Sequence, residues 1–128
     1  MPSSNPLNRR PVFLDLRVIR LPVNALVSIL HRLSGLFLIV VLPFWVWLLG
    51  ESLTSEAGYL HARAILHSWG AWLALFSLTA LGHHFFAGLR HLAMDVHWGL
   101  TRDASRWSAW GVLVLDAVCL PLWWRMVV

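Results

Sequence analysis

The sequence contains few charged residues: Asp, Glu, Lys and Arg make up 12% of its 128 residues, whereas 59% are hydrophobic. Soluble domains carry charge on about 25% of their residues. The mean hydropathy of +0.68 agrees with this imbalance. The composition therefore excludes an ordinary soluble domain and indicates a chain that lies in a lipid bilayer.

Cysteine is also scarce, since Cys119 is the only one in the sequence. A single cysteine excludes a disulfide within the chain, and it excludes covalent haem attachment through a C-x-x-C-H motif. The N-terminal segment lacks the uninterrupted apolar core of a signal peptide because Asp15, Arg17 and Arg20 interrupt it. We expect no signal or transit peptide.

Three long apolar runs take up most of the chain, at residues 33–50, 64–89 and 107–124, and Asp116 is the only Asp, Glu, Lys or Arg among them. Each run is long enough to cross about 30 Å of hydrocarbon as a helix. We predict an all-α integral membrane protein that forms part of a heteromeric helical bundle. Its predicted parts are an interfacial segment at 1–25 and a three-helix transmembrane domain at 26–128, with spans at about 26–50, 64–89 and 107–125.

Basic residues are concentrated before the first span and between the second and third spans. The connection between the first two spans carries only Arg63, together with Glu51 and Glu56. By the positive-inside rule, the N-terminus and the second connection face the cytoplasm. The formal net charge of +4 therefore reflects membrane topology. No nucleic-acid partner is expected. The arginines on the predicted cytoplasmic side are Arg9, Arg10, Arg17, Arg20, Arg90, Arg102 and Arg106.

The stretch "GHHFFAGLRH" at 82–91 places adjacent histidines in an apolar helix. His84 lies about 8 Å inside the end of the second span, where polar side chains are costly. Interhelical hydrogen bonding, a proton path and axial ligation of haem would each explain it. His84 has neighbours that leave room for a flat porphyrin, whereas His83 points about 100° away and has no such space. His84 is the better ligand candidate. Its neighbours three and four residues away are Ala80, Leu81, Ala87 and Gly88.

His91 lies on the same face as His84, beside Arg90 at the membrane edge, where cationic donors would meet haem propionates. One helix cannot supply both axial ligands, because His84 and His91 are about 10 Å apart along one side. Within this chain, His31 could come close enough to serve as the second ligand only if its side chain turned inward from the start of the first span. We therefore expect a sister subunit to supply the second ligand. Two further histidines lie toward the opposite membrane face: His61 and His67.

The stretch "SILHRLSG" at 28–35 places Ser28, His31, Arg32 and Gly35 on one helical face at the start of the first span. Antiparallel packing would bring this face next to His84. A half-buried pocket with hydroxyl, imidazole and guanidinium donors suits a quinone, whose carbonyl oxygens need donors. The alternative for Arg32 is a snorkelling anchor at the membrane surface.

Three motifs carry a resemblance to a known family: "RPVFLDLRVIRLP" at 10–22, "SILHRLSG", and "HHFFAGLRHLAMD" at 83–95. Over about residues 10–99 the chain resembles the cytochrome b membrane-anchor subunits of succinate dehydrogenase. The resemblance implies that His84 is an axial ligand of haem b and that Ser28 and Arg32 line the ubiquinone site. It also implies that His31 and His91 lie near the haem propionates.

The resemblance further implies a complex in a bacterial inner membrane, with a flavoprotein subunit, an iron–sulfur subunit and a second membrane anchor as partners. This chain would not oxidise succinate alone. Three alternatives remain open at this point. They are a fumarate reductase anchor, a haem-free anchor, and a small transporter or channel subunit that uses intramembrane histidine and aspartate.

Two carboxylates have no role implied by the resemblance. Asp95 is expected to pair with Arg90 or with a neighbouring subunit. Asp116 lies about ten residues into the third span, where an aspartate facing lipid would cost about 2.5 to 3.5 kcal/mol. We therefore expect Asp116 to face another helix and to find a hydrogen-bond partner there.

Overall fold

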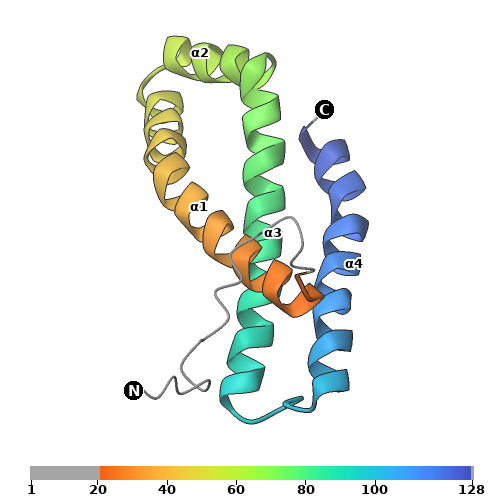
Figure 1. Cartoon of the computed structure of the whole chain (residues 1–128). Coiled ribbons are helices and arrows are strands. Elements are labelled where there is room, and N and C mark those ends of the chain that lie inside the picture. Colours follow the sequence, from red (N-terminus) through yellow and green to blue (C-terminus); the bar gives the residue numbers. More distant parts are fainter. Residues whose placement is uncertain (1–20, 128) are drawn as a thin grey trace, which may run out of the picture.

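A computed structural model describes residues 21–127, which form helices joined by short connections (Figure 1). The described part contains no strand, and three of its helices are long and apolar enough to cross a membrane. The prediction of an all-α chain with three membrane spans is confirmed. The motif at 10–20 and the arginines before Leu21 lie outside the described residues. The helices are α1 (Val23–Thr54), α2 (Glu56–Leu66), α3 (Trp69–Asp95) and α4 (Arg102–Val127).

Helix α1 is longer than the bilayer is thick. Its 32 residues span about 48 Å at 1.5 Å per residue, compared with a hydrocarbon thickness of about 30 Å. Figure 1 shows α1 crossing α3 obliquely and beginning beside α4. The helix starts after Pro22, which is extended and whose carbonyl accepts hydrogen bonds from the amides of Ala25 and Leu26. The oblique course brings the start of α1 against both other spans.

Helix α2 occupies the connection between the first two spans, where the sequence had indicated no helix. Ser55 caps it by accepting a hydrogen bond from the amide of Gly58 at 3.0 Å. Glu56 in the first turn and Arg63 in the last turn complement the helix dipole. The helix is interrupted at His67 and Ser68. Helix α3 therefore begins five residues after residue 64, where the second span was predicted to begin. We call this end of the molecule the α2 end and the opposite one the Asp95 end.

The helices share a small core near the Asp95 end. Val27 of α1, Ala87 of α3, and Ala109 and Val112 of α4 are buried together. Most large apolar side chains are instead exposed along the length of the spans. Lipid tails solvate such side chains as well as a protein interior does, so this exposure is stable in a bilayer.

Arg90 ties the three spans together at the Asp95 end. Its guanidinium is buried, with Nε donating to Ser108 Oγ at 3.0 Å. Its Nη2 donates to Asn24 Oδ1 at 3.3 Å and to the hydroxyl and carbonyl oxygens of Ser105 at 3.1 and 3.2 Å. The expected pair between Arg90 and Asp95 is therefore not formed, and Asp95 is exposed. The guanidinium of Arg90 faces α4 rather than His84 and His91. It is therefore not placed to meet a group bound beside these two histidines.

Replacing Arg90 should loosen the bundle. Arg90→Met removes the hydrogen bonds to Ser105, Ser108 and Asn24, and it leaves these part-buried groups without their donor. We expect the free energy of unfolding to fall by about 1–3 kcal/mol. The measurement is the thermal midpoint of the detergent-solubilised protein by circular dichroism. The control is Arg63→Met on the exposed surface of α2, and equal midpoints for the two variants would contradict this role.

Candidate functional site

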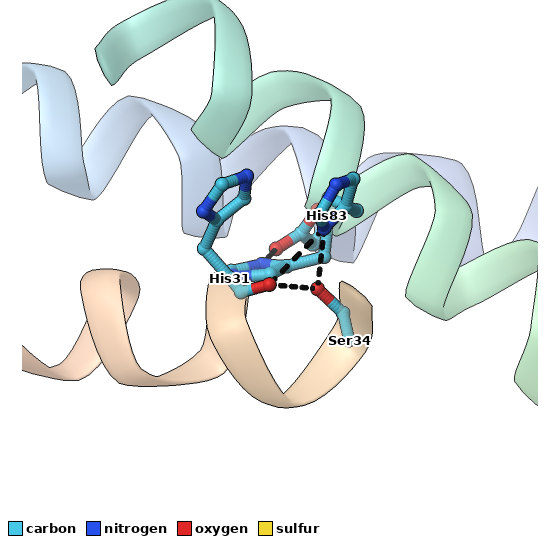
Figure 2. A network of polar contacts seen from close by, with 5 residues as sticks. His31, Ser34 and His83 are labelled. Atoms are coloured by element: carbon cyan, nitrogen blue, oxygen red, sulfur yellow. Dashed lines mark hydrogen bonds and ion pairs between the residues drawn. The ribbon is translucent and has the colours of Figure 1, made fainter. Parts of the chain in front are cut away.

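His84 is held between α3 and α1 by the backbone of α1. Its Nδ1 lies 3.1 Å from the carbonyl oxygen of His31 and 3.3 Å from Ser34 Oγ, and the Ser34 hydroxyl donates to the same carbonyl at 2.9 Å. Figure 2 shows this network, with His31 and Ser34 on the ribbon of α1. The position of the imidazole is thus set by a helix backbone, which is more rigid than a side chain.

These contacts determine which nitrogen of His84 carries the proton. A carbonyl oxygen only accepts hydrogen bonds, so Nδ1 must be the donor. In a neutral imidazole Nε2 then holds a free lone pair. Histidines that bind metals commonly donate their other N–H to a backbone carbonyl in this way. A neutral His84 with its proton on Nδ1 has the form that a metal requires.

Gly35 allows α1 to approach the His84 ring closely. A Cβ at this position would lie 2.8 Å from His84 Cε1 and 3.2 Å from its Nδ1, so any other residue would collide with the imidazole. Gly35 was placed on the polar face of the first span by its spacing, but its contact with His84 was not predicted. The glycine and the carbonyl of His31, one turn apart on α1, together fix the ring.

His31 does turn inward. Its ring stacks on His84 with centroids 4.3 Å apart and planes at 15°, and it lies 5.2 Å from the ring of His91. The space that Gly88 leaves is occupied by His31, whose Nε2 would be 3.4 Å from a Cβ there. Because stacked rings direct their nitrogens within their own planes, His31 does not face His84 across a bound metal. Ala87 packs in the core and does not line this site.

An apolar cavity of about 750 Å³ lies between α1 and α3, with His84 and Gly35 among its lining residues. It extends toward the α2 end as far as Trp45, whose indole N–H donates to Ser77 Oγ at 3.1 Å. The volume falls within the usual range of small-molecule and cofactor sites, about 300–1,000 Å³. An imidazole with a free lone pair thus borders a space suited to a large apolar group. The remaining wall residues are Leu38, Ile39, Val41, Leu42, Ala74, Leu78 and Leu81.

Ser28 and Arg32 lie one turn apart on α1, close in sequence to His31. Ser28 is half-buried and Arg32 is exposed. Within residues 21–127, neither side chain forms a hydrogen bond with another residue. The structure brings His31, His84 and His91 together. It leaves Asp95 outside this group, exposed at the end of α3.

His83 faces the other way and contacts α4. Its Nδ1 lies 2.6 Å from Asp116 Oδ2, and both side chains are largely buried. The prediction that Asp116 faces another helix and finds a partner is confirmed. The sequence analysis did not name His83 as this partner, because the sequence alone does not show which residue of α3 faces α4. No group of three or more histidine, cysteine or acidic residues within the described part of the chain is arranged to hold a metal by itself.

Comparison with known proteins identifies relatives over most of the chain. Residues 6–122 match the family described as "Succinate dehydrogenase/Fumarate reductase transmembrane subunit". A succinate dehydrogenase cytochrome b556 subunit from Coxiella burnetii is 34% identical over 116 residues, which cover 89% of this chain and 93% of that protein. The protein of the same name from Paracoccus denitrificans is 33% identical over 114 residues, 88% of each chain. A cytochrome b560 subunit from Reclinomonas americana is 33% identical over 98 residues, 71% of this chain and 67% of that one.

Proposed function

The chain belongs to the succinate dehydrogenase/fumarate reductase transmembrane subunit family, and on this premise we propose that it is the cytochrome b anchor of a succinate dehydrogenase, binding haem b and helping to form the quinone-reduction site. It is a membrane subunit of a multisubunit enzyme. The observation that carries the haem proposal is the hydrogen bond from His84 Nδ1 to the carbonyl of His31, which leaves Nε2 free for iron.

The residues around His84 fit a haem. The cavity of about 750 Å³ offers apolar walls for the porphyrin, and Gly35 keeps the imidazole in a fixed position at the cavity. His31 and His91 form a polar edge beside His84, where propionates would find donors. When bound, haem b supplies one-electron redox chemistry. His84 is proposed as one axial ligand.

The second axial ligand is proposed to come from another membrane anchor. The stacked geometry of His31 and His84 supports this, because it does not direct an imidazole nitrogen of His31 to the position opposite His84. The flavoprotein and iron–sulfur subunits are proposed as the remaining partners. We also propose that the Asp95 end faces the cytoplasm, where electrons from succinate would reach it through the iron–sulfur subunit.

Ser28 and Arg32 are proposed as donors to a ubiquinone carbonyl. Their place near His31 puts them at the same end of the bundle as the proposed haem edge. The hydroxyl and guanidinium would orient the carbonyl and stabilise the negative charge that develops as the ring accepts electrons. Reduction to quinol takes up two electrons and two protons, so the ring needs hydrogen-bond contact with groups that pass protons from the surface. The exposed position of Arg32 supports such access.

The arrangement of the histidines argues against a transporter or channel. His31, His84 and His91 gather near the Asp95 end, and His61 lies at the α2 end with Glu51 as its neighbour at 3.6 Å. The cavity between these two groups is lined almost entirely by apolar side chains. The described residues therefore provide no polar path across the membrane. Both curated bacterial relatives named above are succinate dehydrogenase subunits, which favours succinate oxidation over fumarate reduction as the direction.

Haem content should depend on one of the two adjacent histidines. His84→Ala removes the proposed ligand and is expected to abolish or strongly lower haem per assembled complex. His83→Ala should reduce the yield of complex, because it leaves Asp116 without its donor, but the complex that assembles should keep its haem. The measurement is the dithionite-reduced b-type absorbance of purified complex. Equal haem loss per complex in the two variants would refute the assignment.

The close approach at Gly35 gives an independent test of the haem site. In Gly35→Ala the new Cβ must displace the His84 ring, so haem occupancy should fall or the absorbance band should shift. Gly50→Ala is the matched control, because this glycine lies in the same helix with no atom within 4 Å of the added Cβ. An unchanged spectrum and haem content in Gly35→Ala would show that this contact does not position the ligand.

Ser28→Ala and Arg32→Leu should impair quinone reduction selectively. Loss of donors that stabilise developing charge predicts a decrease in succinate-to-quinone turnover of about 10- to 1,000-fold. Haem content and dye-linked succinate oxidation should change much less. Arg32→Lys separates the two roles of this residue, since a snorkelling anchor tolerates lysine whereas a donor that uses the guanidinium fork does not. Normal quinone turnover in both Arg32→Lys and Ser28→Ala would move the quinone site elsewhere.

A further inference from the structure

The two adjacent histidines of α3 are directed to different helices. His84 contacts the backbone of α1, and His83 contacts Asp116 of α4. Successive residues of an α-helix differ by about 100° in direction. A rotation of α3 by this amount would therefore exchange the two imidazoles and present His83 to the cavity.

His83 has the chemistry to compete for iron. Its Nδ1 hydrogen-bonds with Asp116 Oδ2, and when Nδ1 of a neutral ring is the donor the lone pair lies on Nε2, as in His84. Within residues 21–127, Nε2 of His83 and Oδ1 of Asp116 are buried and make no hydrogen bond. The pair is therefore not part of a longer polar chain that leads to the cavity. A proton-transfer role has no support in these contacts, whereas within residues 21–127 each histidine hydrogen-bonds through Nδ1 and makes no hydrogen bond through Nε2.

Asp116 opposes the exchange. It lies about midway along α4 with its side chain only 18% exposed, and its Oδ2 lies 2.6 Å from Nδ1 of His83. If α3 rotated to bring His83 into the cavity, the carboxylate would lose this donor in apolar surroundings, which is costly at membrane depth. Gly82, next to His83, also lies beside α4, where an added Cβ would be in ordinary contact with the indole of Trp123 at 3.6 Å.

We propose that Asp116 is a positioning residue that determines which of the two adjacent histidines binds haem: it engages His83 from α4 and thereby fixes the rotation of α3 that presents His84. This proposal rests on the proposed haem site. Asp116 itself does not touch the cavity, since it is absent from the lining and acts through His83 and α3.

The test removes the acceptor and follows haem ligation by electron paramagnetic resonance of the oxidised, purified complex. In Asp116→Leu the population with His84 rotated away should rise by about 3- to 20-fold, the range expected for losing one interhelical hydrogen bond in a membrane. This should appear as lower haem per complex and a second low-spin signal. Asp116→Asn keeps an oxygen acceptor for His83 Nδ1–H, so it should retain a single signal like that of the wild type.

The double variant Asp116→Leu/His83→Leu separates positioning from packing. It removes the competing imidazole together with the carboxylate, so the second signal should disappear and the wild-type signal should return. Ser108→Ala is the control, because it breaks a different polar contact between α3 and α4 and should leave the signal unchanged.

A wild-type signal and haem content in Asp116→Leu would overturn the proposal. So would an equal loss of haem in Asp116→Leu and in the double variant, because that result would indicate a packing defect independent of His83. Failure of the proposed haem site is recognised separately: it would show as full haem retention in His84→Ala with Asp116 intact.

Discussion

The arrangement of this chain depends on one constraint: a polar group inside the hydrocarbon must find its hydrogen-bond partner within protein. The intramembrane polar side chains of the described spans largely obey it, through Trp45 with Ser77, His83 with Asp116, and His84 with the carbonyl of His31. Apolar contacts between helices gain little when lipid is the alternative. Directional polar contacts therefore decide the relative rotation of the helices to a greater extent than in a soluble bundle.

The candidate site follows from this constraint. A histidine placed one and a half turns inside a span needs a partner for each nitrogen, and α1 supplies one of these through a backbone carbonyl. The close packing at Gly35 makes that approach possible, and Ser34 hydrogen-bonds the same carbonyl. His84 also lines the apolar cavity between α1 and α3. On the proposed function, the contact that stabilises the helix pair would also prepare an imidazole for iron.

The sequence was sufficient to predict the three membrane spans, because long uninterrupted apolar runs leave few alternatives to a membrane-spanning helix. It was not sufficient to predict α2, because the charged residues there are typical of a surface connection. The helix depends on the Ser55 cap and on packing against α1. Within the site, the choice of His84 over His83 came from the small residues near it on α3. The inward turn of His31 and the contact between Gly35 and His84 depend on how α1 is rotated against α3, and the periodicity of one helix contains no information about its neighbour. For the same reason, Asp116 was expected to have a partner that could not be named.

The pattern of exposure indicates how the rest of the enzyme contributes. Lipid can cover the exposed leucines, valines and tryptophans, but a second ligand for the proposed haem and further walls for the proposed quinone site at Ser28 and Arg32 would have to come from protein. If each of two chains provides one imidazole to a single haem, binding of haem stabilises only the paired state. By mass action, haem then favours association of the two anchors, and association raises the affinity for haem. A site left half-built within one chain is therefore a means of coupling cofactor insertion to assembly.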